Sequence, residues 1–215
     1  MSLTDYIESH TTAPDHVLDA VERWAHLHTA QPQMICGPYV GSLLTILCRA
    51  CNAHAALEIG SFVGYSTICI ARGLAPDGTL HAFEINEEYE APIRRHLDMA
   101  GVGEKVSLHS ADATQSLSIH NSHFTIHQNS IDFAFIDADK RSNALLFDLI
   151  VPLLRPGGLL LVDNVLWGGK VLDPVTHHDI DTRLIRDFND KLHADPRVQN
   201  IMLPLRDGLS LSIKL

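Results

Sequence analysis

The sequence predicts an α/β protein with a doubly wound, mostly parallel, seven-stranded sheet, helices at its N-terminus and an antiparallel C-terminal hairpin. Short, nearly continuous apolar runs alternate with helical patterns, as in parallel sheets that helices cover on both faces. The last two apolar runs are joined by a tight turn, and strands connected so closely must pair antiparallel. The chain has 215 residues, of which 46% are hydrophobic, so it can bury a full core without disulfides or metals.

The N-terminal region, residues 1–52, is expected to be helical. A first helix opens after Pro14, and a second follows Gly37 and extends to about Cys51. Cys48 and Cys51 form a C-x-x-C pair inside the second helical pattern. A redox pair would sit at a strand-to-helix turn, so we expect structural thiols here instead.

The remaining region, residues 53–215, carries the predicted strands and completes one domain that spans the chain. Helical spacing returns from Tyr65 to Arg72 and again, in a more polar stretch, from Glu87 to about Ala100. The seven strands are expected at residues 55–59, 80–85, 105–109, 131–136, 159–162, 201–204 and 209–213.

The charge of the chain limits its partners. Sixteen Lys and Arg stand against 26 Asp and Glu, a formal net charge of −10. This balance argues against a nucleic acid partner, which requires a basic face, although it does not exclude a local basic patch. No signal-peptide pattern is visible and no apolar stretch approaches ~18 residues, so we expect a cytoplasmic protein that does not enter the membrane.

A glycine-containing turn follows the first predicted strand. Gly60 and Gly64 flank this turn, where the backbone must bend sharply and a ligand can approach closely. Their spacing is G-x-x-x-G, not the G-x-G-x-x-G of dinucleotide-binding folds. Glu84 ends the next strand, where a carboxylate can accept both ribose hydroxyls of a nucleoside. Each feature alone also suits an ordinary turn or a solvated carboxylate, but together they favour an adenosine-bearing cofactor.

Oxygen-bearing side chains follow two later strands. Asp137 comes directly after the strand at 131–136, and Asp163 and Asn164 follow the next strand. The carboxyl ends of adjacent parallel strands meet at one edge of a sheet, where ligands bind. Carboxylate and amide oxygens are the ligands that Mg²⁺ prefers, and a cation removes the repulsion between close carboxylates. Helix capping by Asp139 and Asn164 is the alternative, but it leaves the carboxylates of Asp137 and Asp163 unexplained.

At these positions the chain resembles the cation-dependent O-methyltransferases, the family of caffeoyl-CoA and catechol O-methyltransferases. The resemblance extends from about Met34 to near the end of the chain, and its most specific motifs are Asp-Ala-Asp-Lys at 137–140 and Asp-Asn-x-x-Trp at 163–167. It implies the Rossmann-like class I S-adenosylmethionine (SAM) methyltransferase fold, which ends in an antiparallel hairpin, and a single methyltransferase domain over residues 1–215. Further matching runs lie at 57–60, 64–66, 133–136, 154–158, 189–192, 203–204 and 207–209.

The resemblance also implies roles for individual residues. The divalent cation, Mg²⁺ or else Mn²⁺ or Ca²⁺, would be held by Asp137, Asp163 and Asn164. Lys140 matches the general base of the catechol enzymes, and Lys140, Asn164 and Trp167 would contact the substrate. The residues implied to surround SAM are Cys36, Glu58, Gly60, Ser61, Ser66, Glu84, Asp112, Ala113, Asp137 and Asp139.

The implied activity is methylation of one hydroxyl of a small catechol-type substrate, a vicinal dihydroxy aromatic. Gly168 stands where the plant enzymes carry a substrate-contacting asparagine, and the stretch between Trp167 and a helix expected near Asp181 is shorter than their substrate loop. Both departures favour a bacterial-type enzyme for small catechols over caffeoyl-CoA itself. Cys36 occupies a position that is often Thr or Ser in relatives, which weakens one expected hydroxyl contact to SAM. Relatives are often dimers, so we expect a homodimer.

Three alternatives stay open. A hydroxylated uridine of tRNA is the alternative acceptor within the family, and Arg94-Arg95 and Lys140-Arg141 supply local positive charge. An NAD(P)-dependent oxidoreductase would use the same sheet and the acidic Glu84, but the glycine spacing speaks against it. A non-catalytic binding protein would not require all the predicted cation ligands together with Lys140.

Overall fold

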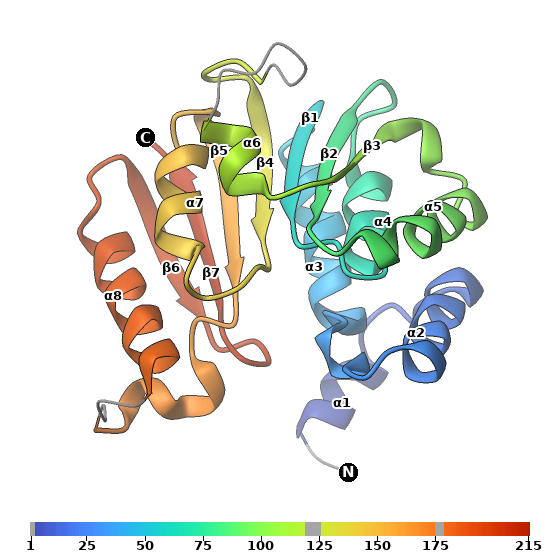
Figure 1. The fold of residues 1–215 in the computed structure, drawn as a ribbon, viewed down its shortest axis with the longest axis horizontal. Coiled ribbons are helices and arrows are strands. Elements are labelled where there is room, and N and C mark those ends of the chain that lie inside the picture. The colour runs from blue at the N-terminus through green and yellow to red at the C-terminus, as the bar shows by residue number, and fades with distance from the viewer. Residues whose placement is uncertain (1–2, 119–125, 175–178) are drawn as a thin grey trace. The chain divides into compact units, whose positions relative to one another are not determined.

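The computed structural model describes residues 3–118, 126–174 and 179–215. Its strands form a seven-stranded sheet in the order β3-β2-β1-β4-β5-β7-β6, and helices alternate with the first five strands along the chain (Figure 1). This arrangement confirms the predicted α/β class. The strands are β1 (Ala55–Ile59), β2 (Thr79–Glu84), β3 (Val106–Ser110), β4 (Ile131–Ile136), β5 (Leu154–Asp163), β6 (Val198–Leu203) and β7 (Leu209–Lys214).

Strand pairing follows the predicted directions. β2 pairs parallel with β3 and β4 parallel with β5, whereas β7 pairs antiparallel with both β5 and β6. The predicted terminal hairpin is therefore confirmed. β5 begins at Leu154, whereas the sequence predicted a strand from residue 159. The predicted start was too late because the Pro-Gly-Gly sequence at 156–158 is typical of a loop. The structure accommodates those residues through a register shift in the pairing with β4, between Ile131 and Phe133.

The helices include three that the sequence analysis did not identify, namely α1, α6 and α7. All three are only six to eight residues long, too short for a clear helical period. The helices are α1 (Leu3–Ser9), α2 (His16–His28), α3 (Gly37–Ala50), α4 (Tyr65–Gly73), α5 (Glu90–Met99), α6 (Ala113–Ser118), α7 (Asn143–Ile150) and α8 (Ile180–Ala194).

The contacts of the chain group into two compact units. The first unit comprises the described residues up to Ala56 together with Ser61–Ala111, and the second comprises the described residues of Leu57–Gly60 and Asp112–Leu215. The amino-terminal part of β1 thus belongs to the first unit, and its carboxyl-terminal part leads into the second.

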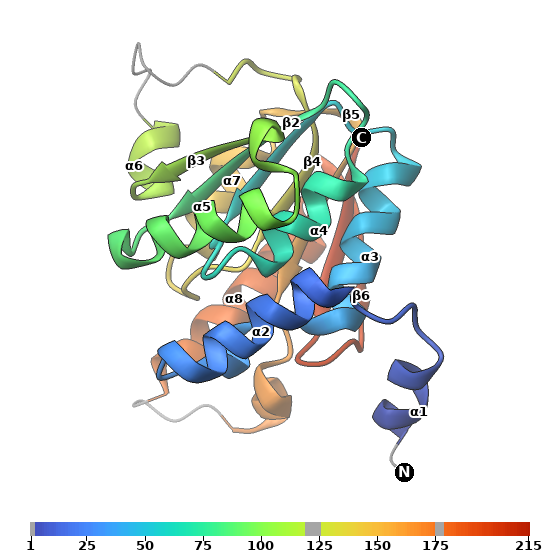
Figure 2. The same ribbon diagram turned by 90° about the vertical axis from the view of Figure 1, so that its right-hand side faces the viewer.

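The first unit is built on packed helices beside β2 and β3. Asp15 caps α2 by accepting a hydrogen bond from the Leu18 backbone N–H at 3.1 Å, and the apolar stripe of α2 that follows is buried. α3 and α4 lie side by side (Figure 2) and are in extensive contact. Cys48 on α3 is buried and Cys51, directly after α3, is half-buried, and neither forms a disulfide, as expected of structural thiols.

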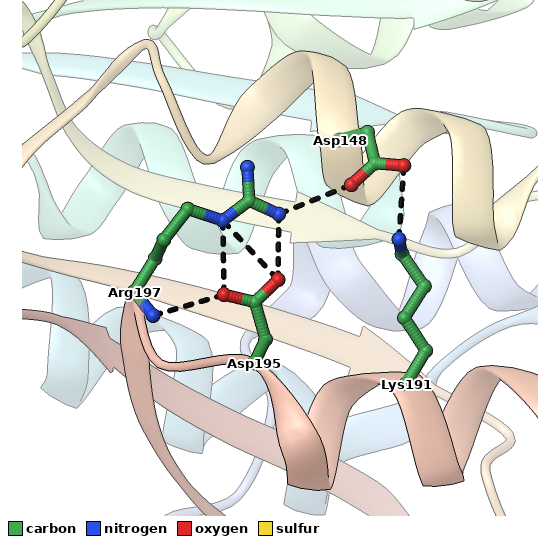
Figure 3. A network of polar contacts seen from close by, with 4 residues as sticks. All are labelled: Asp148, Lys191, Asp195 and Arg197. Atoms are coloured by element: carbon green, nitrogen blue, oxygen red, sulfur yellow. Dashed lines mark hydrogen bonds and ion pairs between the residues drawn. The ribbon is translucent and has the colours of Figure 1, made fainter.

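A polar network joins α7, α8 and the loop before β6 in the second unit (Figure 3). Asp148 on α7 accepts from Lys191 at 3.0 Å and from Arg197 at 3.1 Å, and Arg197 also pairs with Asp195 at 2.6 Å. Most of these side chains are half-exposed, so each pair contributes only about 0–1 kcal/mol. Beneath them Phe147 is fully buried, and the Arg197 guanidinium lies 5.5 Å from its ring centroid. The buried aromatic ring is therefore the main anchor of this contact.

In the described part of the chain, no helix combines the length and the apolar character that a membrane span requires.

Candidate active site

The turn after β1 places the backbone of Gly60 directly against that of Asp137. Gly60 has φ +93°, and a Cβ built on it would lie 2.1 Å from the Asp137 carbonyl oxygen. Next to this contact, the Asp137 N–H donates to the Ile59 carbonyl at 2.8 Å. Glu58, two residues before Gly60, is fully buried, and its charge raises the pKa of Asp137. Only glycine permits the backbone at position 60 to approach the Asp137 carbonyl so closely, which explains the first glycine of the predicted G-x-x-x-G turn.

In the first unit, the same turn is fastened to the end of β2. The Ser61 N–H donates to the Phe83 carbonyl at 3.1 Å. The Glu84 carboxylate accepts from the Phe62 N–H at 2.7 Å and from the Asn86 N–H at 2.9 Å. Burial raises the pKa of Glu84, while these backbone hydrogen bonds favour its charged form. The predicted ribose ligand therefore also holds the glycine turn in place.

Two further predicted SAM contacts are buried in the first unit. Cys36 directly precedes α3 and is 4% exposed, and Ser66 lies in the first turn of α4 and is 7% exposed. Their contacts with SAM remain a prediction.

The two predicted carboxylate ligands leave neighbouring parallel strands of the second unit. Asp137 follows β4 and Asp163 ends β5, and the last paired residues before them are Ile136 and Val162. Burial, together with the negative charge of Asp163, raises the pKa of Asp137 to about 7. Burial also raises the pKa of Asp163. Each carboxyl thus resists ionisation, a cost that a bound divalent cation would offset, so this donor set fits a hard cation.

Lys140, Asn164 and Trp167 lie together beside these carboxyls. The Lys140 ammonium donates to Asn164 Oδ1 at 2.8 Å and to the Ala138 carbonyl at 3.2 Å, and it lies 5.9 Å from the centroid of the Trp167 ring. Asn164 adopts φ +61°, and its N–H donates to Asp163 Oδ1 at 2.7 Å. The structure therefore brings the predicted base, the predicted amide ligand and the predicted substrate contact into one cluster.

The predicted cation site depends on its amide ligand. Within residues 3–118, 126–174 and 179–215, no three His, Cys, Asp or Glu side chains are grouped so that they could hold a metal ion. A third protein ligand beside the two carboxylates must therefore come from another residue type, such as Asn164.

Three other predicted SAM contacts have local structural roles. Asp139 is exposed and accepts from Ser142 Oγ at 2.6 Å just before α7. Asp112 accepts from the Thr114 N–H at 2.8 Å at the start of α6, where Ala113 is buried. These hydrogen bonds support the alternative in which Asp139 caps a helix. Asp112 likewise accepts a local hydrogen bond at the start of a helix. Their cofactor contacts stay predictions.

One charged residue that acts on this cluster, Arg206 in the turn between β6 and β7, was not predicted from the sequence. Its positive charge lowers the pKa of both strand-end carboxyls, partly offsetting the effect of burial. The turn is held against the loop that follows β5, because the Leu166 N–H donates to the Asp207 carbonyl at 2.8 Å. The sequence predicted a turn at 206–208 but contained no local signal that it lies beside Asn164.

Comparison with known proteins places this arrangement in a family. The family model described as O-methyltransferase matches residues 8–215. A probable caffeoyl-CoA O-methyltransferase of Dictyostelium discoideum is 34% identical over 176 residues, which cover 81% of this chain and 75% of that protein. The caffeoyl-CoA O-methyltransferase of Petroselinum crispum is 36% identical over 179 residues, covering 80% and 73% of the two chains.

A solved structure gives the same result. The O-methyltransferase from Bacillus cereus, in complex with SAH, superposes with a TM-score of 0.88 at 29% identity, covering 98% of this chain and 96% of that one. The strand order, the strand-end cluster and these matches agree with one another. This chain therefore belongs to the class I SAM-dependent O-methyltransferase family.

Proposed function

We propose that this enzyme methylates one hydroxyl of a small vicinal dihydroxy aromatic compound, with a divalent cation held by Asp137, Asp163 and Asn164. The observation that carries the proposal is the pair of strand-end carboxyls with raised pKa, beside an amide oxygen and Lys140. The names of the relatives support an aromatic acceptor, and the SAH complex of the Bacillus cereus protein supports SAM as the methyl donor.

The cation would be Mg²⁺, or else Mn²⁺ or Ca²⁺, because these ions prefer oxygen ligands. When bound, such a cation supplies a Lewis acid that lowers the pKa of an acceptor hydroxyl. The Asn164 side chain has a second function in this arrangement, since its oxygen also accepts the hydrogen bond that holds the Lys140 ammonium.

The residues of the chain mainly position the acceptor and move one proton. Methyl transfer is an in-line displacement in which the acceptor oxygen bonds to the methyl carbon as the carbon–sulfur bond breaks, so alignment provides much of the catalysis. Lys140 is proposed to accept the proton of the attacking hydroxyl, a role in which it must first release its own proton and react as the neutral amine. The indole ring of Trp167, beside Lys140, offers an apolar face for an aromatic acceptor.

The SAM side of the reaction is proposed to use Glu84 and residues of the glycine turn. The Glu84 carboxylate, which the Phe62 and Asn86 N–H groups hold in place, is proposed to accept the ribose hydroxyls. The methionine part of SAM would contact Glu58, Gly60, Ser61 and Ser66.

The proposal is tested by incubating the protein with SAM and 3,4-dihydroxybenzaldehyde, with and without EDTA, and measuring the methylated product by mass spectrometry. EDTA should abolish turnover, and added Mg²⁺ should restore it. Asp163→Asn should lower the Mg²⁺-dependent rate by about 100-fold or more, because it removes a charged ligand. Asp190→Asn, which alters an exposed carboxylate on α8, is the matched control and should leave the rate unchanged.

Turnover that survives EDTA would overturn the role of the cation. Methylation of tRNA but of no diol would favour the hydroxyuridine acceptor instead. The family assignment favours methyl transfer over NAD(P) chemistry, so SAH but not NADH should raise the melting temperature.

A further inference from the structure

The two oxygens of the Glu84 carboxylate are held by backbone N–H groups from two different segments of the first unit. Oε2 accepts from the Phe62 N–H at 2.7 Å, in the turn after β1, and Oε1 accepts from the Asn86 N–H at 2.9 Å, just after β2. The orientation of this carboxylate therefore depends on how firmly Phe62 and Asn86 are held.

The backbone of Phe62 has a conformation that side-chain-bearing residues rarely adopt, with φ +49°. Such a conformation persists only where the surrounding structure holds it, and residues of this kind cluster at ligand sites. Glycine would adopt the same conformation without strain. A buried phenylalanine at this position indicates that its ring has a role that glycine would not fulfil.

Tyr89 contacts both of the residues that donate to Glu84. Its ring meets the Phe62 ring edge to face, with the centroids 5.0 Å apart and an angle of 79° between the planes. Its backbone N–H donates to the Asn86 carbonyl at 3.1 Å, within the short 3-10 helix Glu87–Tyr89 that Asn86 caps. Tyr89 thus supports the donor to Oε1 through its backbone and the donor to Oε2 through its ring.

We propose that Tyr89 is a positioning residue for SAM. Its ring holds the Phe62 turn in the left-handed conformation, so that the Phe62 N–H orients the Glu84 carboxylate toward the ribose hydroxyls. Tyr89 acts through Phe62 and has no contact of its own with the cofactor in this role. The inference rests on the proposed contact between Glu84 and the ribose.

The test measures, by isothermal titration calorimetry on the full chain, the binding of SAH and of its 2′,3′-dideoxy analogue, which lacks both ribose hydroxyls. The wild-type protein should bind SAH about 10-fold or more tightly than the analogue, because hydrogen bonds to a charged group are lost. Tyr89→Leu should weaken SAH binding by about 3- to 10-fold, the size expected for loss of an edge-to-face aromatic pair. Binding of the analogue should change less than about 2-fold, so the ratio of the two affinities falls.

Three further variants separate positioning from a general loss of stability. Tyr89→Phe keeps the ring and should recover the wild-type ratio to within about 2-fold. Val21→Ala trims a fully buried side chain of α2 in the same unit, so it should lower the melting temperature without changing the ratio. Phe62→Leu removes the other ring of the pair. Adding Tyr89→Leu to it should weaken SAH binding less than about 2-fold further, because both substitutions break the same contact.

The outcomes distinguish this inference from the proposed function, and none of them depends on the identity of the methyl acceptor. If the wild-type protein binds SAH and the dideoxy analogue equally well, the proposed contact between Glu84 and the ribose fails, and the role of Tyr89 fails with it. If the wild type prefers SAH but Tyr89→Leu keeps the same ratio, only the role of Tyr89 is overturned. The same conclusion follows if Tyr89→Phe or Val21→Ala lowers the ratio as much as Tyr89→Leu, or if the effects of Phe62→Leu and Tyr89→Leu are additive.

Discussion

Replacing Gly60 with alanine should cost much more stability than the same replacement at Gly64, although both glycines have a positive φ, +93° and +89°. The difference lies in what the new methyl group meets. At Gly60 the Cβ would lie 2.1 Å from the Asp137 carbonyl oxygen, a backbone atom, whereas at Gly64 its nearest neighbour is a side-chain methyl of Ile93 at 3.5 Å. Gly64→Ala is therefore a matched control for conformational strain alone.

The magnitudes follow from these distances. A positive φ costs an L-residue about 1–2 kcal/mol, which is the whole expected effect of Gly64→Ala. Real Cβ contacts are essentially never under 3.0 Å, so at Gly60 the backbone near Asp137 must shift by close to 1 Å. That shift weakens the hydrogen bond from the Asp137 N–H to the Ile59 carbonyl, now 2.8 Å, and leaves buried polar groups poorly paired at about 1–3 kcal/mol. Gly60→Ala should thus cost about 2–5 kcal/mol.

The assay is urea denaturation of both variants at pH 7.5, combined with their methyltransferase rates. Gly60→Ala should also lower the rate by about 100-fold, because a displacement near 1 Å moves a proposed cation ligand. Gly64→Ala should keep that ligand in position. If the two variants unfold within about 1 kcal/mol of each other and Gly60→Ala retains the wild-type rate, the close backbone contact does not constrain Asp137 and the reasoning is wrong.

Two other predictions concern the first unit. Burial lowers the pKa of His109 to about 4, with a smaller contribution from the charge of His81, whose ring nitrogen lies 3.1 Å away. The unfolded chain takes up this proton near pH 6.5 and the folded chain only near 4, so the free energy of unfolding should fall by about 1–3 kcal/mol as the pH drops through this window. His109→Phe should reduce that fall in urea titrations at pH 7.5 and 4.5, and an equal fall in both proteins would contradict the assignment. The Tyr65 hydroxyl is buried with no hydrogen-bond partner among the described residues, and burial raises its pKa. Tyr65→Phe should therefore leave the urea stability unchanged or raise it by up to about 1 kcal/mol, whereas a loss above 1 kcal/mol would reveal a partner for the hydroxyl.

The elements that sequence reasoning predicted well are those with strong local signals. The strand at 131–136 is nearly continuous in apolar residues, and Asp15 stands immediately before the buried stripe of α2. α7 was missed because its eight residues, mostly apolar, show no clear helical period. β5 was predicted too short because its pairing with β4 accommodates a Pro-Gly-Gly sequence that would locally favour a loop.

The sequence by itself determined the chemistry available at the strand ends, because the carboxyl ends of adjacent parallel strands lie at one edge. For that reason Asp137, Asp163 and Asn164 could be named as cation ligands from their positions alone. Only the tertiary structure decided how the surrounding groups act on them. Desolvation and neighbouring charge set the pKa of the carboxyls, and contacts between segments distant in sequence bring Lys140 to Asn164 and the turn of Arg206 to the same loop. Such contacts depend on strand register and turn geometry over the whole sheet, which local sequence patterns do not specify.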